Sequence, residues 1–528
     1  MPFNVQDLLT ESAWLHDVDQ IRLIETHISW VILTGQFVYK IKKPVDVGFA
    51  DFTTLQSRRH FCEEELRLNR RLAPDLYLRV VPVCRLGDGQ IRVESDLNAP
   101  CESSTIIEYA VCMRQFDNDR LLIRMAEQGK LTSEIIDDLG EQVGHFHESI
   151  DVAPPDSPFA TVAAAVGPPM ENFKALHLLC QGGGTPDVAA LEQWTMKEGG
   201  RLATRFQKRA MDGRIRECHG DMHLGNMFLN PSGHVTVFDG IEFNDAFRWI
   251  DVACEVAFTM MDLYDHGQAA CAWRFLDRWL QITGDYDALG VLRFYLVYRA
   301  VVRCKVDLIR AQQSGVSIQV VTSLCRESTQ FLKLAGSFTQ PVNPAIIITC
   351  GPSGSGKTWG SQPLVEQLGF VRIRSDVERK RMVGLSALDT SQSSVGKGLY
   401  SSQSSERVYR HLLELAQSVV DSGYGVIVDA TFLKSSQRRM FQEWAIQCNL
   451  PFIILQFDAR PETLIERVRQ RAAFGQDASE ANEQVIQSQL EHRDVLTPLE
   501  QSLVIQGGQQ ETLQLIQARL DSFQTDIK

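Results

Sequence analysis

A glycine-rich loop directly follows an apolar run in the C-terminal third of the chain. The run AIIITC (345–350) has the length and β-branched composition of a buried strand, and a helical pattern comes after the loop. Backbone N–H groups of such a loop can surround a β-phosphate, the lysine can bind the β- and γ-phosphates, and the threonine hydroxyl can ligate Mg²⁺. The loop therefore predicts an ATP site, built from Gly351, Pro352, Ser353, Gly354, Ser355, Gly356, Lys357 and Thr358.

Two aspartates follow later apolar segments. Asp376 comes after FVRIRS (370–375), and Asp429 ends the run YGVIVD. In a doubly wound sheet both carboxylates would stand at strand C-termini beside the phosphate loop. Ala430 stands where a hydrolytic motor usually has a glutamate that activates water, which favours transfer to a bound hydroxyl. We expect Asp376 to accept the hydroxyl proton and Asp429 to hold Mg²⁺ with Thr358; Asp376 could also be a helix N-cap.

Two arginines are candidates for neutralising charge on the transferred phosphoryl group. Arg467 and Arg471 stand four residues apart in a helical pattern that begins at Pro461, so they share one helix face. A lid that carries arginines would suit a phosphoryl-transfer site. The alternative is a solvated basic face.

A second set of candidate residues lies in the segment CHGDMHLGNMFL (218–229). Asp221 and Asn226 stand five apart on one loop, and the following strand GHVTVFD ends in Asp239. This spacing can bring together a general base, Asp221, and two Mg²⁺ ligands, Asn226 and Asp239, for phosphoryl transfer from ATP. A rival interpretation places Zn or Fe on His219, Asp221 and His223, but it leaves Asn226 and Asp239 without a role.

Such a site also needs a lysine on a strand and a glutamate on a helix to orient the α- and β-phosphates. The strand-like FVYKIKKP offers Lys40, with Lys42 as an alternative, and FCEEELRLNRRL offers Glu64. Tyr295 and Arg299, in the long helical pattern 291–310, could line an acceptor pocket or belong to a helical core, as could Arg303.

The motifs of the first part resemble the aminoglycoside phosphotransferase family, within the wider protein-kinase-like fold. HGDMHLGN is similar to that family's catalytic loop and VFDGIEFN to its metal-binding segment, over roughly residues 20–310. The resemblance implies a structural role for Asp251 in WIDVACE. It does not name the acceptor.

Residues 345–510 resemble the P-loop kinases grouped with polynucleotide kinase and the zeta toxins. The resemblance rests on the phosphate loop, RSD at 374–376, VDATFLKSSQRR at 428–439 and the arginine pair. It implies that Asp376 is the base and that Arg379 and Arg438 contact substrate. A cluster of basic residues in the same region could bind a substrate that already carries phosphate, or could form a solvent-exposed helix face. The cluster comprises Arg372, Arg374, Arg379, Lys380 and Arg381.

The elements that must position these residues predict the fold class. Strand-like pieces dominate up to about residue 115 and long helical patterns follow, so we expect an α+β two-lobed kinase-like domain over 1–336, with a small lobe of about 1–115 and a helical lobe of about 116–336. A polar stretch with two prolines, 337–344, reads as a linker. Residues 345–528 then form an α/β doubly wound P-loop NTPase domain.

Composition excludes several classes of protein. The chain has 528 residues, 44% of them hydrophobic, and a formal net charge of −13, which argues against a protein that coats nucleic acid. We expect a cytoplasmic protein that is not bound to a membrane, because no apolar segment reaches the roughly 18 residues of a spanning helix and the N-terminus lacks a basic export signal. The 12 cysteines include no CxxC pair, as is typical of reduced thiols.

These patterns together predict a bifunctional enzyme that uses ATP and Mg²⁺ to phosphorylate small-molecule hydroxyl groups at two sites. One alternative is an ATP-binding regulatory protein whose kinase-like half is degenerate. Another is a kinase of nucleic-acid 5′ ends, which the acidic composition disfavours. The oligomeric state is left open.

Overall fold

The computed structural model describes residues 3–48, 50–96, 104–180, 186–313, 315–389, 402–474 and 478–526. Contacts between Cα atoms divide the chain into two compact units. The first comprises Met1–Leu139, Phe146–Glu171 and Phe206–Asp262, and the second comprises Gly140–His145, Asn172–Arg205 and Leu263–Lys528.

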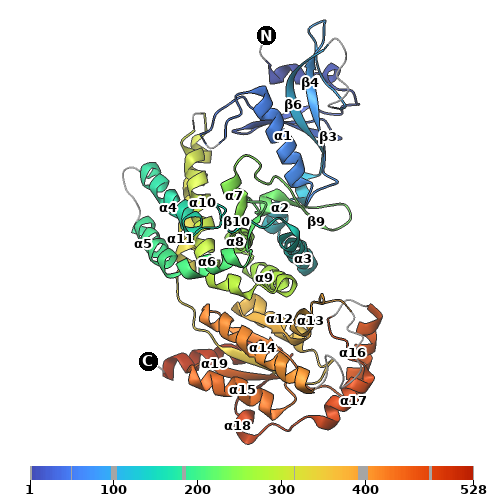
Figure 1. Ribbon diagram of the computed structural model, residues 1–528, viewed down its shortest axis with the longest axis vertical. Helices are drawn as coiled ribbons and strands as arrows, with labels where there is room; N and C mark the ends of the chain where they lie inside the picture. The colour runs from blue at the N-terminus through green and yellow to red at the C-terminus, as the bar shows by residue number, and fades with distance from the viewer. Residues whose placement is uncertain are drawn as a thin grey trace. The chain divides into compact units, whose positions relative to one another are not determined.

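An antiparallel six-stranded sheet dominates the start of the first unit, with strand order β1-β2-β3-β6-β4-β5. Helix α1 covers one face of this sheet (Figure 1), where Cys62 packs against Tyr77 and Val111. The other face is sealed by the N-terminal residues, with Trp14 packed on Tyr39. The elements are β1 (Arg22–Glu25), β2 (Ser29–Leu33), β3 (Phe37–Lys42), α1 (Leu55–Asn69), β4 (Tyr77–Arg85), β5 (Ile91–Val93) and β6 (Thr105–Arg114).

Two short antiparallel pairs, β7 with β10 and β8 with β9, carry the loops that contain the predicted catalytic residues. The strand predicted to end in Asp239 is β9, which ends two residues earlier at Val237. The elements are α2 (Leu122–Glu127), α3 (Ser133–Ser149), β7 (Ile215–Glu217), β8 (Met227–Leu229), β9 (Val235–Val237), α7 (Asp245–Arg248), β10 (Trp249–Asp251) and α8 (Val252–Asp265).

Helices α5, α9, α10 and α11 belong to the second unit, whereas α4 and α6 each contain residues of both units. Helices α10 and α11 form an antiparallel pair with extensive contact, and α10 is buried along most of its length. The elements are α4 (Val162–Leu179), α5 (Pro186–Arg201), α6 (Ala203–Met211), α9 (Ala269–Thr283), α10 (Leu289–Ala311) and α11 (Ile318–Phe338).

A five-stranded parallel sheet forms the C-terminal part, with strand order β12-β13-β11-β14-β15. Its strands are continuous apolar runs such as Ile346–Cys350 because helices cover both faces. This is the predicted doubly wound arrangement. The elements are β11 (Ile346–Cys350), α12 (Lys357–Leu368), β12 (Val371–Arg374), α13 (Ser375–Arg381), α14 (Ser402–Asp421), β13 (Val426–Asp429), α15 (Ser435–Gln447), β14 (Phe452–Gln456), α16 (Pro461–Phe474), α17 (Glu483–His492), α18 (Pro498–Gln501), β15 (Val504–Gln506) and α19 (Thr512–Asp526).

Helix α11 ends at Phe338 and β11 begins at Ile346, so the stretch predicted as a linker lies between these two elements apart from its first residues. The two compact units do not follow the predicted division at 336, because the helices after residue 262 group with the parallel sheet. The boundaries 1–336 and 345–528 therefore stay a prediction.

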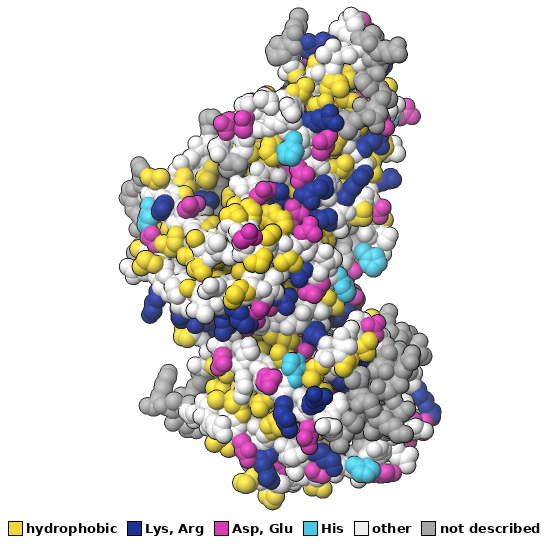
Figure 2. All heavy atoms as spheres, viewed as in Figure 1, with side chains coloured by type: hydrophobic (Ala, Val, Ile, Leu, Met, Phe, Trp, Pro, Cys, Tyr) yellow, Lys and Arg dark blue, Asp and Glu magenta, His cyan; other side chains and the backbone are white. Residues whose placement is uncertain are grey.

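The surface carries both signs of charge. On the face drawn in Figure 2, basic and acidic side chains lie intermingled over the described residues. Among those residues the structure contains no helix with the length and apolar character needed to cross a membrane.

Candidate active sites

The glycine loop wraps around the ammonium group of Lys357. Lys357 Nζ donates to the carbonyl oxygens of Gly351 at 3.0 Å and Pro352 at 2.8 Å. Gly351 has a φ of 151°, and a Cβ at this position would lie 2.2 Å from the carbonyl oxygen of Phe457, so only glycine fits. Burial lowers the pKa of Lys357, and the nearby carboxylates of Asp429 and Asp376 oppose that effect.

Thr358 and Asp429 form the predicted metal-binding pair. Thr358 Oγ1 donates to Asp429 Oδ2 at 2.6 Å, at the start of α12 and the end of β13. Thr349 Oγ1 lies 3.4 Å from the other carboxylate oxygen and donates instead to the Ala430 carbonyl oxygen at 2.7 Å, so it fixes the backbone that follows β13. Hydroxyl and carboxylate oxygens are the hard ligands that Mg²⁺ prefers, and this donor set fits it.

Asp376 lies in the first turn of α13, beside the phosphate loop. Its carboxylate is close enough to raise the pKa of the Lys357 ammonium against the effect of burial. The N-cap of α13 is Arg374, so the structure does not support an N-cap role for Asp376. A partly exposed carboxylate near Lys357 is available to accept a proton from a bound hydroxyl.

The two predicted lid arginines both lie near the phosphate loop. Arg467 Nη1 donates to the carbonyl oxygen of Gly354 at 3.3 Å. Arg471, one helical turn later on α16, is close enough to lower the pKa of Lys357. Both arginines therefore lie near the loop, and their role in phosphoryl transfer stays a prediction.

Arg438 is buried in an ion pair with Glu500. Its side chain is 1% exposed, and Arg438 Nε donates to Glu500 Oε1 at 2.6 Å. Arg438 Nη1 also donates to the carbonyl oxygen of Phe432 at 3.0 Å. The expectation that Arg438 contacts substrate is therefore wrong for this structure, because a buried ion pair occupies the guanidinium group.

Lys40 is the strand lysine that faces the other candidate site. Lys40 Nζ lies 2.5 Å from Asp239 Oδ1 and 2.8 Å from Glu65 Oε1. Burial opposes the charge on Lys40, but the two carboxylates outweigh it and raise the pKa of the ammonium group. The same lysine lowers the pKa of Asp239 in spite of burial.

The helix glutamate in this network is Glu65, and the prediction of Glu64 was wrong by one residue. Glu64 pairs with Arg67 on the outer side of α1, whereas the side chain of Glu65 is fully buried. The signal was available in the sequence, because the buried face of α1 follows the helical spacing of Cys62, Glu65 and Asn69.

Lys42, the alternative lysine, has a different environment. Its side chain is fully buried between Glu65 and Glu242, and its ammonium group pairs with both. Lys42 therefore ties β3 and α1 to the segment after β9, while Lys40 reaches the carboxylate predicted to bind metal. The sequence singled out neither Glu242 nor this second ion pair.

Asp221 and Asn226 lie together, as predicted. Asn226 Nδ2 donates to Asp221 Oδ2 at 3.1 Å and to the Asp221 carbonyl oxygen at 3.0 Å. Asp239 has a left-handed φ of 63°, an unusual conformation for a non-glycine residue that is typical of functional sites. The amide of Asn226 and the carboxylate of Asp239 offer oxygen ligands that suit Mg²⁺.

His219 is a structural residue of this loop. His219 Nε2 donates to the Phe238 carbonyl oxygen at 2.9 Å, and Nδ1 accepts from the Asp221 N–H at 3.3 Å. Burial lowers the pKa of the imidazole, which agrees with a neutral ring. Because both ring nitrogens are used, the rival Zn or Fe site on His219, Asp221 and His223 finds no support.

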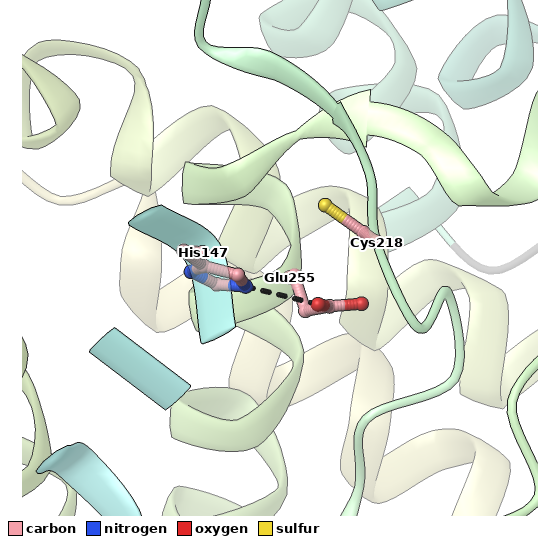
Figure 3. A group of neighbouring side chains, drawn as sticks. All are labelled: His147, Cys218 and Glu255. Carbon is pink, nitrogen blue, oxygen red and sulfur yellow. Dashed lines mark hydrogen bonds and ion pairs between the residues drawn. The ribbon is translucent and has the colours of Figure 1, made fainter. Parts of the chain in front are cut away.

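The buried carboxylate of Glu255 anchors this loop, and Figure 3 shows it beside His147 and Cys218. Glu255 Oε1 accepts from the Gly220 N–H at 2.6 Å, and Glu255 Oε2 accepts from the His219 N–H at 3.2 Å and lies 2.9 Å from His147 Nε2. Burial opposes the charge on Glu255, but these partners lower its pKa to about 2. Cys218 lies beside them, and burial raises the pKa of its thiol well above the usual range, so this cluster suits positioning better than metal binding.

Asp251, which the family resemblance marks as structural, is indeed tied to the scaffold. It forms a bidentate ion pair with Arg209 at 2.7 Å, and both side chains are buried. Glu255, four residues later, anchors the loop that carries Asp221, and the sequence pattern carries no signal for this role.

The residues proposed to line an acceptor pocket on α10 belong to the helical core. Tyr295 and Arg299 are buried, and the guanidinium of Arg303 stacks over the ring of Phe331 on α11. Their surroundings support the core interpretation over the pocket.

Comparison with known proteins defines the two domains. Residues 52–294 match the model of the phosphotransferase enzyme family, and residues 346–496 match that of an AAA domain. The chain therefore joins a phosphotransferase-type domain of the kinase-like fold to a P-loop α/β domain, and the predicted resemblance is confirmed. Both domain types imply use of ATP and support a kinase or phosphotransferase enzyme.

Two relatives align with most of the chain. The chain is 26% identical over 457 residues to uncharacterised proteins of Mycobacterium tuberculosis and Mycobacterium bovis, covering 86% of this chain and 87% of theirs.

Among solved structures, an amicoumacin kinase bound to AMP-PNP, Ca²⁺ and amicoumacin is similar over 63% of this chain and 94% of its own, with 13% identity and a TM-score of 0.37. An ethanolamine kinase of Plasmodium vivax is similar over 62% of this chain and 84% of its own, with 9% identity and a TM-score of 0.37. A gluconokinase of Sinorhizobium meliloti is similar over 35% of this chain and 94% of its own, with 19% identity and a TM-score of 0.23.

Proposed function

We propose that the chain is a bifunctional ATP-dependent phosphotransferase, in which each module transfers the γ-phosphoryl group of ATP to a hydroxyl of a small-molecule acceptor. The observation that carries the proposal is that one chain holds two separate sets of phosphate-binding lysine, base and metal-ligand candidates. Lys40, Asp221 and Asp239 form one set. Lys357, Asp376 and Asp429 form the other.

In the phosphotransferase-type module, Asp221 accepts the proton of the acceptor hydroxyl as its oxygen attacks the γ-phosphorus, and the bond to the ADP oxygen breaks. The contact with the Asn226 amide orients the Asp221 carboxylate. Lys40, held by Glu65, binds the α- and β-phosphates. Asn226 and Asp239 would hold Mg²⁺, which neutralises phosphate charge when bound.

In the P-loop module, Asp376 takes the base role, and Lys357 binds the β- and γ-phosphates. Arg467 and Arg471 would neutralise charge on the transferred group, as their position beside the loop supports. Thr358 and Asp429 would hold Mg²⁺. The neutral Ala430 next to Asp429 favours transfer over hydrolysis, because a water-activating carboxylate is lacking at that position.

The test is transfer from γ-labelled ATP into a small-metabolite extract, with products resolved by mass. Asp221→Asn should lower the amount of one labelled product by about 100-fold or more, and Lys357→Ala should lower the amount of another by a similar factor. A product lost in one variant and kept in the other assigns that reaction to one module. Tight ATP binding with no labelled metabolite would favour the regulatory alternative, and labelling of a 5′-hydroxyl oligonucleotide would favour the nucleic-acid alternative.

A further inference from the structure

A buried ion pair joins α9 to the strand that precedes Asp376. Arg372 Nη2 lies 2.6 Å from Asp277 Oδ2, and the side chains are 4% and 5% exposed. Burial opposes the charge on Arg372, but Asp277 outweighs it and raises the pKa of the guanidinium group. Asp277 belongs to the part of the chain that matches the phosphotransferase family, whereas Arg372 belongs to the P-loop domain. Both lie in the second compact unit.

The guanidinium group of Arg372 also contacts the last residue of the phosphate loop. Arg372 Nη1 donates to the Thr358 carbonyl oxygen at 2.7 Å, and the Thr358 hydroxyl donates to Asp429 at 2.6 Å. A continuous chain of contacts therefore runs from Asp277 through Arg372 and Thr358 to Asp429, the carboxylate predicted to bind metal.

Gln281, one turn further along α9, contacts arginines at both ends of α13. Gln281 donates to Asp277 Oδ2 at 2.7 Å, and its side-chain oxygen accepts from Arg374 Nη1 at 3.1 Å. Arg374 is the N-cap of α13, two residues before Asp376. The Gln281 carbonyl oxygen also accepts from Arg381 Nη2 at 2.6 Å, at the end of α13.

The end of α9 is shaped to receive α13. Gly284 caps α9 with a left-handed φ of 65°, and a Cβ there would lie 2.6 Å from Arg381 Nε. Just beyond, the hydroxyl of buried Tyr286 lies 3.3 Å from Glu378 Oε1. Trp273, on the same face of α9, packs on Gly369 and the core of the parallel sheet. Helix α9 thus contacts α12, β12 and α13 (Figure 1).

We propose that α9 of the phosphotransferase-type domain is a working part of the P-loop site, in which Asp277 and Gln281 are positioning residues that hold Thr358 and Asp376 in place through Arg372 and Arg374. The expected effect on the transfer rate rests on the proposed function, whereas the expected effect on the order of the P-loop site does not. It also replaces the prediction that Arg372, Arg374 and Arg381 bind a phosphorylated substrate, because α9 already occupies these groups.

The test uses the full chain with Asp277→Asn, which keeps the shape and removes the charge, and with the milder Gln281→Ala. Arg278→Gln is the matched control, since Arg278 also lies on α9 but pairs with Glu141 on α3. Hydrogen exchange of segments 357–360 and 371–381 is measured with Mg·AMP-PNP present. We expect exchange at least ten-fold faster in Asp277→Asn, a smaller increase in Gln281→Ala confined to 374–381, and wild-type rates in the control.

The catalytic readout is the rate of Lys357-dependent transfer per nucleotide site, with sites counted by AMP-PNP titration. Positioning predicts that Asp277→Asn lowers kcat per site about ten-fold or more, with a smaller change in KM for ATP. A purely structural role would instead reduce the number of sites and leave kcat per site unchanged, and would overturn the positioning role. Wild-type exchange rates in Asp277→Asn would overturn the whole inference. Absence of transfer in the wild type would refute the proposed function alone, since the exchange result stands independently.

Discussion

The ammonium group of Lys40 lies 2.5 Å from a carboxylate oxygen of Asp239, although 199 residues separate them along the chain. Glu65 contacts the same ammonium group from α1 at 2.8 Å. Three elements distant in sequence, β3, α1 and the segment after β9, thus meet at one point. Lys42 joins the same three elements through Glu65 and Glu242, so the feature that sets Lys40 apart is its contact with Asp239, the carboxylate predicted to bind metal.

Lys40 and Lys42 should differ in the kind of damage that their loss causes. Lys40→Met should reduce Asp221-dependent transfer by about 100-fold or more with a small change in stability, because Lys40 faces Asp239. Lys42→Met should lower the free energy of unfolding by about 3–5 kcal/mol, since it leaves Glu242 buried without its cation and leaves Glu65 paired with Lys40 alone. Transfer assays and urea unfolding measure the two effects. Equal losses of activity at equal stability would contradict the assignment.

The neighbouring glutamates of α1 provide a second matched pair. Glu65→Gln should raise KM for ATP and lower kcat by about ten-fold or more, because it weakens the hold on both Lys40 and Lys42. Glu64→Gln should change the free energy of unfolding by less than about 1 kcal/mol and leave the kinetics unaltered, since its partner Arg67 is half-exposed. Steady-state kinetics of the Asp221-dependent reaction decide between them. A stronger effect at Glu64 would refute the geometry.

The stability of the chain should depend on the charge of Glu255 in acid. Because the pKa of Glu255 falls from an ordinary 4.5 to about 2 on folding, its stabilisation is complete above about pH 4.5 and is lost as pH falls towards 2. The shift corresponds to about 3 kcal/mol. Urea unfolding between pH 3 and 7 should show that the difference in unfolding free energy between wild type and Glu255→Gln becomes smaller as the pH falls. A difference that stays constant over this range would show that Glu255 is not ionised in the folded protein.

Arg438 should be a stability residue and not a substrate contact. Arg438→Met leaves Glu500 without its buried partner and should cost about 3–5 kcal/mol in the free energy of unfolding. The KM for the acceptor of the P-loop reaction should stay within about two-fold of the wild-type value. A large rise in that KM with unchanged stability would restore the role implied by family resemblance.

Local patterns were enough to predict much of the two sites. The run 345–350, the glycines and Lys357 specify strand, loop and helix within fourteen residues, and β11 and α12 begin at Ile346 and Lys357. The spacing of Asp221 and Asn226 likewise brings them into hydrogen-bond contact through one short loop. Features encoded within one turn or loop are therefore readable from the sequence.

Features that depend on distant partners were not readable. Arg372 and Arg438 look like free basic groups in sequence, but Asp277 and Glu500 neutralise them from 95 and 62 residues away. The choice between Glu64 and Glu65 depends on which way α1 faces the sheet, because adjacent helical residues point about 100° apart. His147 and Glu255 belong to no sequence motif. The fold brings Glu255 to the N–H group of Gly220 and His147 to Glu255.

The most direct test of two ATP sites in one chain is the stoichiometry of Mg·AMP-PNP binding, measured by calorimetry on the full-length protein. We expect two sites per chain in the wild type, one in Lys40→Met, one in Lys357→Ala and none above background in the double variant. A single site in the wild type that Lys357→Ala removes and Lys40→Met leaves intact would contradict the proposal of two ATP sites, and would make the phosphotransferase-type half a domain that does not bind nucleotide.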